Sequence, residues 1–214
     1  MRIVIAGGHG QIALHVERRL AERGDKAVGI VRNPDHVADL ETIGARAVVL
    51  DLEEATVDQV AEAVEGADAV VFAAGGGPGS GAARKESVDQ NAAVLLADAA
   101  ERAGVRRYLM VSAMGTEKAD PDSEDVYQVY LRAKQTADDD LRSRDLDWTV
   151  VKPGRLTNEP GTGRVTVGSL ARGEVTRDDV AAVLVALLDA PGTAGRTFDL
   201  LGGDTPIEEA VASL

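Results

Sequence analysis

Short apolar runs rich in valine, isoleucine and alanine recur along the 214-residue chain. They lack a strict alternation of polar and apolar positions, as expected of strands that are covered by helices on both faces. We therefore predict strands at Ile3–Ala6, Ala27–Val31, Ala47–Leu50, Ala69–Ala73, Tyr108–Val111, Trp148–Val151, Val165–Val167 and Thr197–Leu200.

Segments with a helical spacing of apolar residues separate these runs, and each is long enough for a crossover helix. We predict helices at Ile12–Ala21, Pro34–Thr42, Val57–Val64, Asn91–Ala103, Val126–Leu141 and Val180–Leu188, and a last helix near the C-terminus. A βαβαβ series repeated twice predicts an α/β fold with a doubly wound, mostly parallel, Rossmann-type sheet and helices on both faces. One domain is expected over residues 1–214, with residues from about 153 to 214 as a small extension beside the substrate.

Local signals mark two helix starts and one loop. Thr176 precedes Asp179 by three residues, and Thr205-Pro206-Ile207-Glu208 combines a candidate cap, a first-turn proline and a glutamate that completes a capping box. The glycine-rich stretch Gly75–Gly81 predicts a mobile loop.

The chain contains no cysteine, which excludes disulfides, thiolate nucleophiles and thiolate metal sites. Any redox chemistry must therefore come from a cofactor. The histidines His9, His15 and His36 have no metal-ligand spacing, and we expect no metal. No nucleophile elbow or Walker loop is present, so hydrolase and kinase functions are not favoured.

The net charge of −13, with five lysines beside eighteen arginines, repels phosphate backbones and anionic lipids. We expect no nucleic-acid or membrane partner. A high-salt cytoplasm and a solvated surface on an ordinary bacterial protein both explain the acidity, and the sequence does not choose between them. Because no apolar stretch has the length of a signal peptide or a membrane span, we expect a cytoplasmic protein, whose oligomeric state the sequence leaves open.

The turn Gly7-Gly8-His9-Gly10-Gln11-Ile12-Ala13 lies between the first predicted strand and the first predicted helix. It fits the dinucleotide pattern either as Gly8-x-Gly10-x-x-Ala13 or as Gly7-x-x-Gly10-x-x-Ala13. Glycine allows the backbone to approach a pyrophosphate, whose charge is stabilised by the N–H groups at the helix start. We predict a cofactor site that includes Gly7, Gly10, Gln11 and Ile12.

The end of the second predicted strand indicates which dinucleotide is bound. An NAD-selective site carries an acidic residue about 20 residues after the turn, whereas this chain has Val31-Arg32-Asn33 there. The planar guanidinium of Arg32 suits a 2′-phosphate, so NADP(H) is favoured over NAD(H). Asp51, after the third strand, either accepts a hydrogen bond from the adenine amino group or is an ordinary helix-start residue.

Candidate chemistry follows the fifth predicted strand. Tyr130 and Lys134 share one helical face, and an ammonium beside a phenol lowers the pKa of the phenol. We expect Tyr130 to transfer a proton, Lys134 to lower the pKa of the Tyr130 phenol and Ser112 to hold the substrate oxygen. Two alternatives stay open. Tyr127 lies on the same face and could be the proton donor, and the pair of Tyr130 and Lys134 could be an ordinary aromatic and a solvated lysine.

Several segments together resemble the atypical, NAD(P)H-binding group of the short-chain dehydrogenase/reductase superfamily over nearly the whole chain. They are Ala6–Ala13, Val31–Pro34, Asp51-Leu52, Val111–Gly115, Tyr130–Lys134 and Leu146–Leu156. Two features depart from the family pattern. Ala13 stands where many relatives have glycine, and the spacing from Ser112 to Tyr130 is longer than in many members.

The resemblance implies further cofactor contacts. It places the loop Ala73-Ala74-Gly75 and Leu52 beside the cofactor, Pro153-Gly154 beside the nicotinamide, and Lys134 on the nicotinamide ribose. We predict an NADPH-dependent reductase of a small carbonyl or quinone-like substrate. A non-catalytic NADP(H) sensor is the alternative. A sugar-nucleotide epimerase fits less well, because such relatives generally need a larger C-terminal substrate domain.

Overall fold

The computed structural model describes residues 1–77 and 79–214. Pro78, within the predicted loop Gly75–Gly81, lies outside the described residues. The strands of the main sheet are β1 (Arg2–Ala6), β2 (Lys26–Val31), β3 (Arg46–Val49), β4 (Ala69–Phe72), β5 (Arg107–Val111), β6 (Asp147–Pro153), β8 (Arg164–Gly168), β10 (Arg196–Gly202) and β11 (Thr205–Pro206). Their order across the sheet is β11-β8-β10-β6-β5-β4-β1-β2-β3.

Most neighbouring strands in this sheet are parallel, which confirms the predicted doubly wound α/β fold. Only β8 runs antiparallel to its neighbours β10 and β11 in the described part of the sheet. A second sheet, which the sequence pattern did not predict, pairs β7 (Arg155–Thr157) with β9 (Glu174–Thr176). Three residues are too few to show a period. Because β8, β10 and β11 extend the main sheet, the segment after Pro153 is joined to it, and its role beside a substrate stays a prediction.

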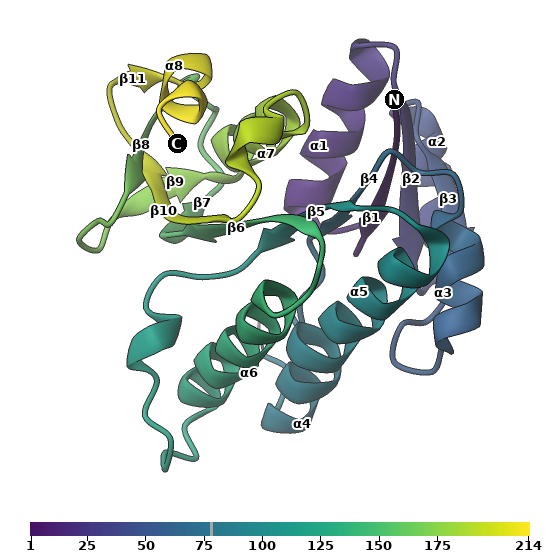
Figure 1. Ribbon diagram of the computed structural model, residues 1–214, viewed down its shortest axis with the longest axis horizontal. Helices are drawn as coiled ribbons and strands as arrows, with labels where there is room; N and C mark the ends of the chain where they lie inside the picture. The colour runs from purple at the N-terminus through teal and green to yellow at the C-terminus, as the bar shows by residue number, and fades with distance from the viewer. Residues whose placement is uncertain (78) are drawn as a thin grey trace.

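Helices cover both faces of the sheet, as Figure 1 shows for α1 and α7 on one side and α5 and α6 on the other. One face packs against α1 (Gln11–Glu22), α2 (Val37–Thr42), α7 (Arg177–Leu188) and α8 (Ile207–Ala212). The other packs against α3 (Val57–Val64), α5 (Ala92–Ala103) and α6 (Val126–Arg142). In β1, Ile3 and Ile5 belong to the first core and Val4 and Ala6 to the second, which explains the uninterrupted apolar run.

Helix starts agree with the capping signals in one case and not in the other. The Thr176 side chain accepts a hydrogen bond from the Asp179 backbone N–H at 2.9 Å, so it caps α7 as predicted. The cap predicted at Thr205 is wrong. Thr205 belongs to β11 and pairs with Val165, so its backbone serves the sheet, and α8 begins at Ile207 without a side-chain cap.

The helix predicted at Asn91–Ala103 begins earlier in the structure. The short helix α4 (Ala82–Arg84) leads into a π-helical segment at Lys85–Asn91, which continues into α5. The wider π turn shifts the side-chain period, so a 3.6-residue pattern is visible only from α5 onward. Such π turns are frequent at functional sites.

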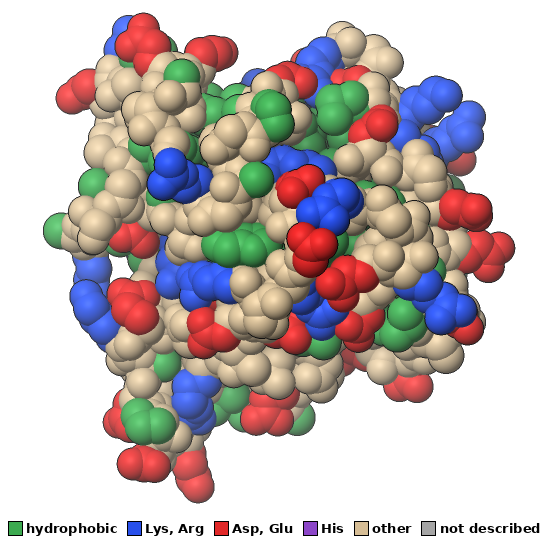
Figure 2. Space-filling view, in the orientation of Figure 1, with side chains coloured by type: hydrophobic (Ala, Val, Ile, Leu, Met, Phe, Trp, Pro, Cys, Tyr) green, Lys and Arg blue, Asp and Glu red, His purple; other side chains and the backbone are tan. Residues whose placement is uncertain are grey.

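Acidic and basic side chains are interspersed over the face shown in Figure 2. Arg144 joins α5 to α6 through ion pairs with Asp98 at 2.6 Å and Asp140 at 2.7 Å. No helix in the described part of the chain is both long enough and apolar enough to cross a bilayer.

Glu17 is the one ionisable residue among the buried residues of α1, and its side chain is fully buried. Its carboxyl lies against two glycines: a Cβ on Gly29 would be 2.4 Å from Glu17 Oε1, and one on Gly8 would be 3.0 Å from it. Neither oxygen has a hydrogen-bond partner among the described residues. Burial raises the pKa of the Glu17 carboxyl from 4.5 to about 8.

We expect Glu17→Gln to stabilise the protein in alkaline solution. Between about pH 4.5 and 8 the unfolded chain loses this proton and the folded chain keeps it, so wild-type stability falls as the pH rises. At pH 8.5 the substitution should raise the free energy of unfolding by on the order of 4 kcal/mol. Denaturant titrations at pH 5 and pH 8.5 measure this difference. Glu22→Gln, at an exposed position on the same helix, is the control, and identical pH profiles for all three proteins would contradict the assignment.

Candidate functional site

The glycine turn joins β1 to α1 at the carboxyl edge of the parallel sheet. Gly7 has a φ of +81°, which disfavours any side chain, and a Cβ there would be 2.6 Å from the Ala74 Cα. Gly10 caps α1 without a side-chain hydrogen bond. The first N–H groups of this twelve-residue helix are therefore free of a capping side chain and suit an anion.

A cavity of about 330 Å³ opens beside this turn at the ends of β1, β2, β3 and β4. Eight of the predicted cofactor residues line it, namely Gly7, Gly10, Arg32, Asp51, Leu52, Ala73, Ala74 and Gly75. Open parallel sheets bind ligands at the carboxyl ends of their strands, where the strand order reverses. Here β1 lies between β4 and β2, so the cavity lies at that reversal.

These residues fit a nucleotide cofactor. The glycine cradle would be filled by a Cβ at Gly7, the helix start offers backbone donors, and the cavity also contains the guanidinium groups of Arg32 and Arg84. Such donors bind phosphates, and the apolar strand ends suit contact with ribose and adenine. The volume of about 330 Å³ accommodates part of a dinucleotide.

Charged residues line part of the cavity. Glu53 forms ion pairs with Arg32 at 3.2 Å and with Arg84 at 3.1 Å. Asp51 accepts a hydrogen bond from the Glu53 backbone N–H at 3.0 Å, so one Asp51 oxygen stabilises the turn that presents Glu53. The adenine contact predicted for Asp51 stays a prediction.

Two histidines also line the cavity. The rings of His9 and His36 stack with their centroids 3.6 Å apart and an angle of 11° between their planes. His9 Nε2 lies 2.8 Å from Asp39 Oδ2, which fixes the ring that follows Gly8. Both rings and Arg32 line the same cavity.

The other predicted cofactor residues lie outside this cavity. Gln11 is exposed and lines a different one of about 360 Å³, together with Arg18 and Arg177. Ile12 belongs to the core beneath the turn. Pro153 is buried at the end of β6, where its carbonyl accepts a hydrogen bond from the Met114 N–H at 3.1 Å.

Lys134 is buried, and its amine reaches the ends of two strands. It donates hydrogen bonds to the carbonyl oxygens of Val111 at 3.1 Å and Ala74 at 3.4 Å, and Ala74 lines the cavity. Asp89, on the π-helical segment, forms an ion pair with it at 3.3 Å and is itself buried. Lys134 is therefore not a solvated lysine, and its charge is compensated inside the protein.

Ser112 points toward α6. Its hydroxyl donates a 2.7 Å hydrogen bond to Asp138, a fully buried carboxyl whose pKa is raised by that burial. Lys152 lies 3.8 Å from the same oxygen and donates to the Thr116 hydroxyl at 2.7 Å. The role of Ser112 in holding a substrate oxygen stays a prediction, and in the structure its hydroxyl donates its hydrogen bond to Asp138.

The expected lowering of the Tyr130 pKa is wrong. Burial raises that pKa, and the Asp89 and Asp138 carboxylates raise it further. Asp89 also compensates the Lys134 ammonium that was expected to lower it. Tyr130 is half-buried, with Lys85 Nζ 5.4 Å from its ring centroid, whereas Tyr127 is 57% exposed.

Sequence reasoning missed the acidic partners of the site, Glu53, Asp89 and Asp138. Each is distant along the chain from the group that it contacts, so no short motif includes both partners. Arg84 carried a weak signal, since it closely follows the glycine-rich loop after β4, where the chain returns toward the sheet edge.

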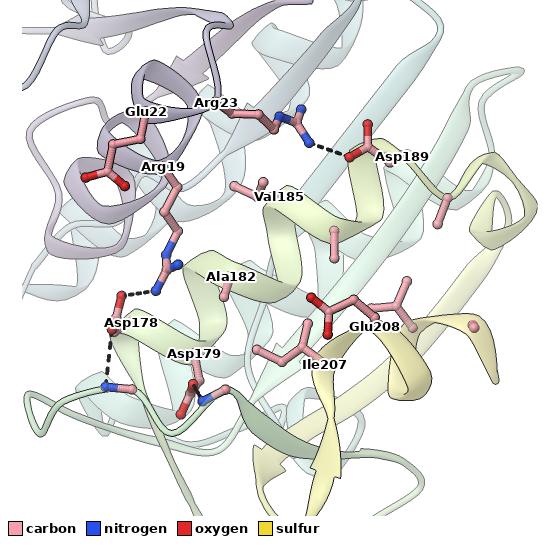
Figure 3. A pocket seen from close by; sticks show the side chains of 16 residues that line it. Arg19, Glu22, Arg23, Asp178, Asp179, Ala182, Val185, Asp189, Ile207 and Glu208 are labelled. Carbon is pink, nitrogen blue, oxygen red and sulfur yellow. Dashed lines mark hydrogen bonds and ion pairs between the residues drawn. The ribbon is translucent and has the colours of Figure 1, made fainter.

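A larger cavity of about 680 Å³ lies between α1, α7 and α8, as shown in Figure 3. Arg19 bonds to Asp178 at 2.6 Å, and Arg23 bonds to Asp189, so the two long helices are joined across it. Its α1 residues come from the C-terminal half of that helix, away from the glycine turn. We therefore place the candidate site in the smaller cavity.

Comparison with known proteins adds the family. A model of the NAD(P)H-binding family matches residues 7–191. The Bacillus subtilis protein YhfK, named as an uncharacterised sugar epimerase, is 38% identical over 100% of both chains. A solved structure from Bacillus halodurans, provisionally described as an NAD-dependent epimerase/dehydratase, is 40% identical over 100% of both chains, with a TM-score of 0.92. The Lactococcus lactis oxidoreductase YlbE is 28% identical over 100% of this chain and 96% of that one, with a TM-score of 0.88.

The buried pair of Lys134 and Asp89 gives a test of the site's construction. Asp89→Asn leaves a buried ammonium without its counter-charge, and we expect a loss of about 3 kcal/mol in the free energy of unfolding. Asp58→Asn is the control, because it breaks an exposed pair with Arg102 whose loss should cost less than about 1 kcal/mol. Denaturant titration compares the two, and equal losses would show that the buried pair is not needed.

Proposed function

Because the chain belongs to the family of NAD(P)H-binding proteins, we propose that it is an NADP(H)-dependent oxidoreductase that reduces a small carbonyl or quinone-like substrate. The observation that carries this proposal is the cavity at the strand-order reversal, which combines the Gly7 and Gly10 cradle with two arginines. Relatives described as an oxidoreductase and as an epimerase/dehydratase support dinucleotide chemistry in general.

The preference for NADP(H) rests on the residues at the end of β2. A site selective for NAD(H) uses an acidic residue there to bind the ribose 2′-hydroxyl. Arg32 stands at that position and is 53% exposed, so its guanidinium is accessible to a phosphate. Arg84 adds a second guanidinium in the same cavity.

When bound, NADPH supplies a hydride to the substrate. Tyr130 is the proposed proton donor: its raised pKa keeps the phenol protonated at neutral pH but also makes it a weaker acid than the lowered pKa that the sequence predicts. Lys134 has a positioning role, since its bonds to the Val111 and Ala74 carbonyls hold the ends of β5 and β4 together. Ser112 contributes only after its hydrogen bond to Asp138 is exchanged.

The names of two relatives favour a second candidate. YhfK and the Bacillus halodurans protein are described with epimerase names, at 38% and 40% identity. An epimerase returns the hydride to its substrate and consumes no cofactor overall. Product analysis with sugar nucleotides in the absence of added reductant would identify this activity.

A non-catalytic NADP(H) sensor is supported by a different observation. The expected catalytic groups Ser112 and Lys134 are both engaged by internal carboxylates. A sensor would bind NADP+ and NADPH with different affinities. It would not oxidise NADPH in the presence of any tested acceptor. Calorimetric titration with both cofactor forms distinguishes this outcome.

We expect NADPH oxidation in the presence of a panel of carbonyls and quinones, and Tyr130→Phe should lower kcat about a hundredfold. Since the Tyr130 pKa is raised, this group should cause no alkaline loss of activity up to about pH 10. Tyr127→Phe, which alters an exposed ring on the same helix, is the matched control. If both variants keep wild-type turnover, neither tyrosine is the proton donor.

Arg32→Glu tests the cofactor preference separately. The carboxylate repels a 2′-phosphate and accepts a bond from a 2′-hydroxyl, so NADP+ binding should weaken about a hundredfold. NAD+ binding should stay the same or strengthen. Calorimetry measures both constants, and an unchanged ratio between them would refute the role of Arg32.

A further inference from the structure

Glu53 is the common partner of both arginines in the cofactor cavity. Its Oε2 atom lies 3.2 Å from Arg32 Nη1 and 3.1 Å from Arg84 Nη2. Its Oε1 atom accepts a 2.6 Å hydrogen bond from the Ser87 hydroxyl. One carboxylate thus holds two guanidinium groups that come from different parts of the chain.

The three charged residues reach the cavity from three separate segments. Arg32 follows β2, Glu53 lies in the loop between β3 and α3, and Arg84 ends α4. The Glu53 side chain is 22% exposed, against 53% for Arg32 and 36% for Arg84. The carboxylate therefore lies deeper than the guanidinium groups, which face the solvent from which a ligand arrives.

The charges of this cluster do not balance. Two guanidinium groups share one carboxylate, which leaves one positive charge in a chain whose net charge is −13. A phosphate carries nearly two negative charges and three acceptor oxygens, so it satisfies two guanidinium groups better than one carboxylate does. Glu53 also repels any phosphate that approaches the same pair.

We propose that Glu53 and the 2′-phosphate of NADP(H) are alternative partners of the Arg32 and Arg84 pair, so that Glu53 and Arg84 set the selectivity between NADP(H) and NAD(H). This inference rests on the proposed function, because it concerns the cofactor of the same site. With NAD(H), which lacks the phosphate, Glu53 keeps both arginines. With NADP(H), the phosphate displaces it, and part of the binding energy is lost in that exchange.

Substitution of Glu53 gives a result opposite to that of an ordinary supporting residue. Glu53→Gln removes the competing charge, so NADP+ should bind about tenfold more tightly, with NAD+ changed less than about twofold. Arg84→Gln removes one phosphate partner, so NADP+ should bind about tenfold more weakly, again with little change for NAD+. Isothermal titration of the full chain measures the four constants.

Two smaller probes isolate the phosphate from the rest of the cofactor. The affinity for adenosine 2′,5′-bisphosphate should change as the affinity for NADP+ does. The affinity for adenosine 5′-monophosphate should stay the same in both variants. The matched controls are Glu54→Gln, at the neighbouring carboxylate, and Arg102→Gln, at an exposed arginine paired with Asp58. Neither control residue lines the cavity.

The outcomes separate this inference from the proposed function. If the wild-type protein binds neither dinucleotide, the proposed function fails and the exchange fails with it. If the wild-type protein binds NADP+ but Glu53→Gln weakens that binding or leaves it unchanged, Glu53 only supports the arginines. The exchange alone is then refuted. If Arg84→Gln changes the affinities for NADP+ and NAD+ equally, Arg84 does not bind the 2′-phosphate.

Discussion

Three backbone segments approach one another closely at the cofactor turn because Gly7, Gly8 and Gly29 carry no side chains, and the arrangement of the site depends on this close contact. A Cβ on Gly7 would be 2.6 Å from the Ala74 backbone, and one on Gly8 would be 2.5 Å from Gly29. Only glycine permits both approaches, and Gly7 also needs it for its positive φ. The contact draws the ends of β1, β2 and β4 together, which puts Arg32 and the loop after β4 around one cavity.

Internal carboxylates engage the polar groups around this cavity. Glu53 pairs with Arg32 and Arg84, Asp89 pairs with Lys134, and Asp138 accepts a hydrogen bond from the Ser112 hydroxyl. Burying a charge without a partner is costly, so the buried Lys134 ammonium needs its Asp89 counter-charge. The same pairs mean that binding a phosphate or a substrate involves exchange of partners in addition to formation of new bonds. The raised Tyr130 pKa results first from burial of the phenol, and the nearby Asp89 and Asp138 carboxylates add to it.

Much of the fold could be predicted, because uninterrupted apolar runs mark the buried strands and a helical spacing of apolar residues marks the helices between them. The helix predicted at Val57–Val64 has these same bounds in the structure, and the predicted strands lie within one or two residues of the observed ones. The errors have physical causes. Thr205 was assigned to a helix cap because capping signals are local, whereas its backbone pairs with a distant strand. The π turn at Lys85–Asn91 follows no 3.6-residue period, so the helical segment was predicted to begin too late.

The sequence by itself determined the α/β fold, the glycine turn and the position of Arg32 at the end of the second strand, because each depends on neighbours along the chain. The tertiary structure decided which groups meet. Lys134 and Asp89 are on different helical segments, and Glu53 is distant along the chain from both of its arginines. Electrostatic interactions depend on distance in space and on burial, neither of which a linear pattern contains. For that reason the sequence placed Tyr130 and Lys134 on one helical face correctly, and only the structure gave the direction of the Tyr130 pKa shift.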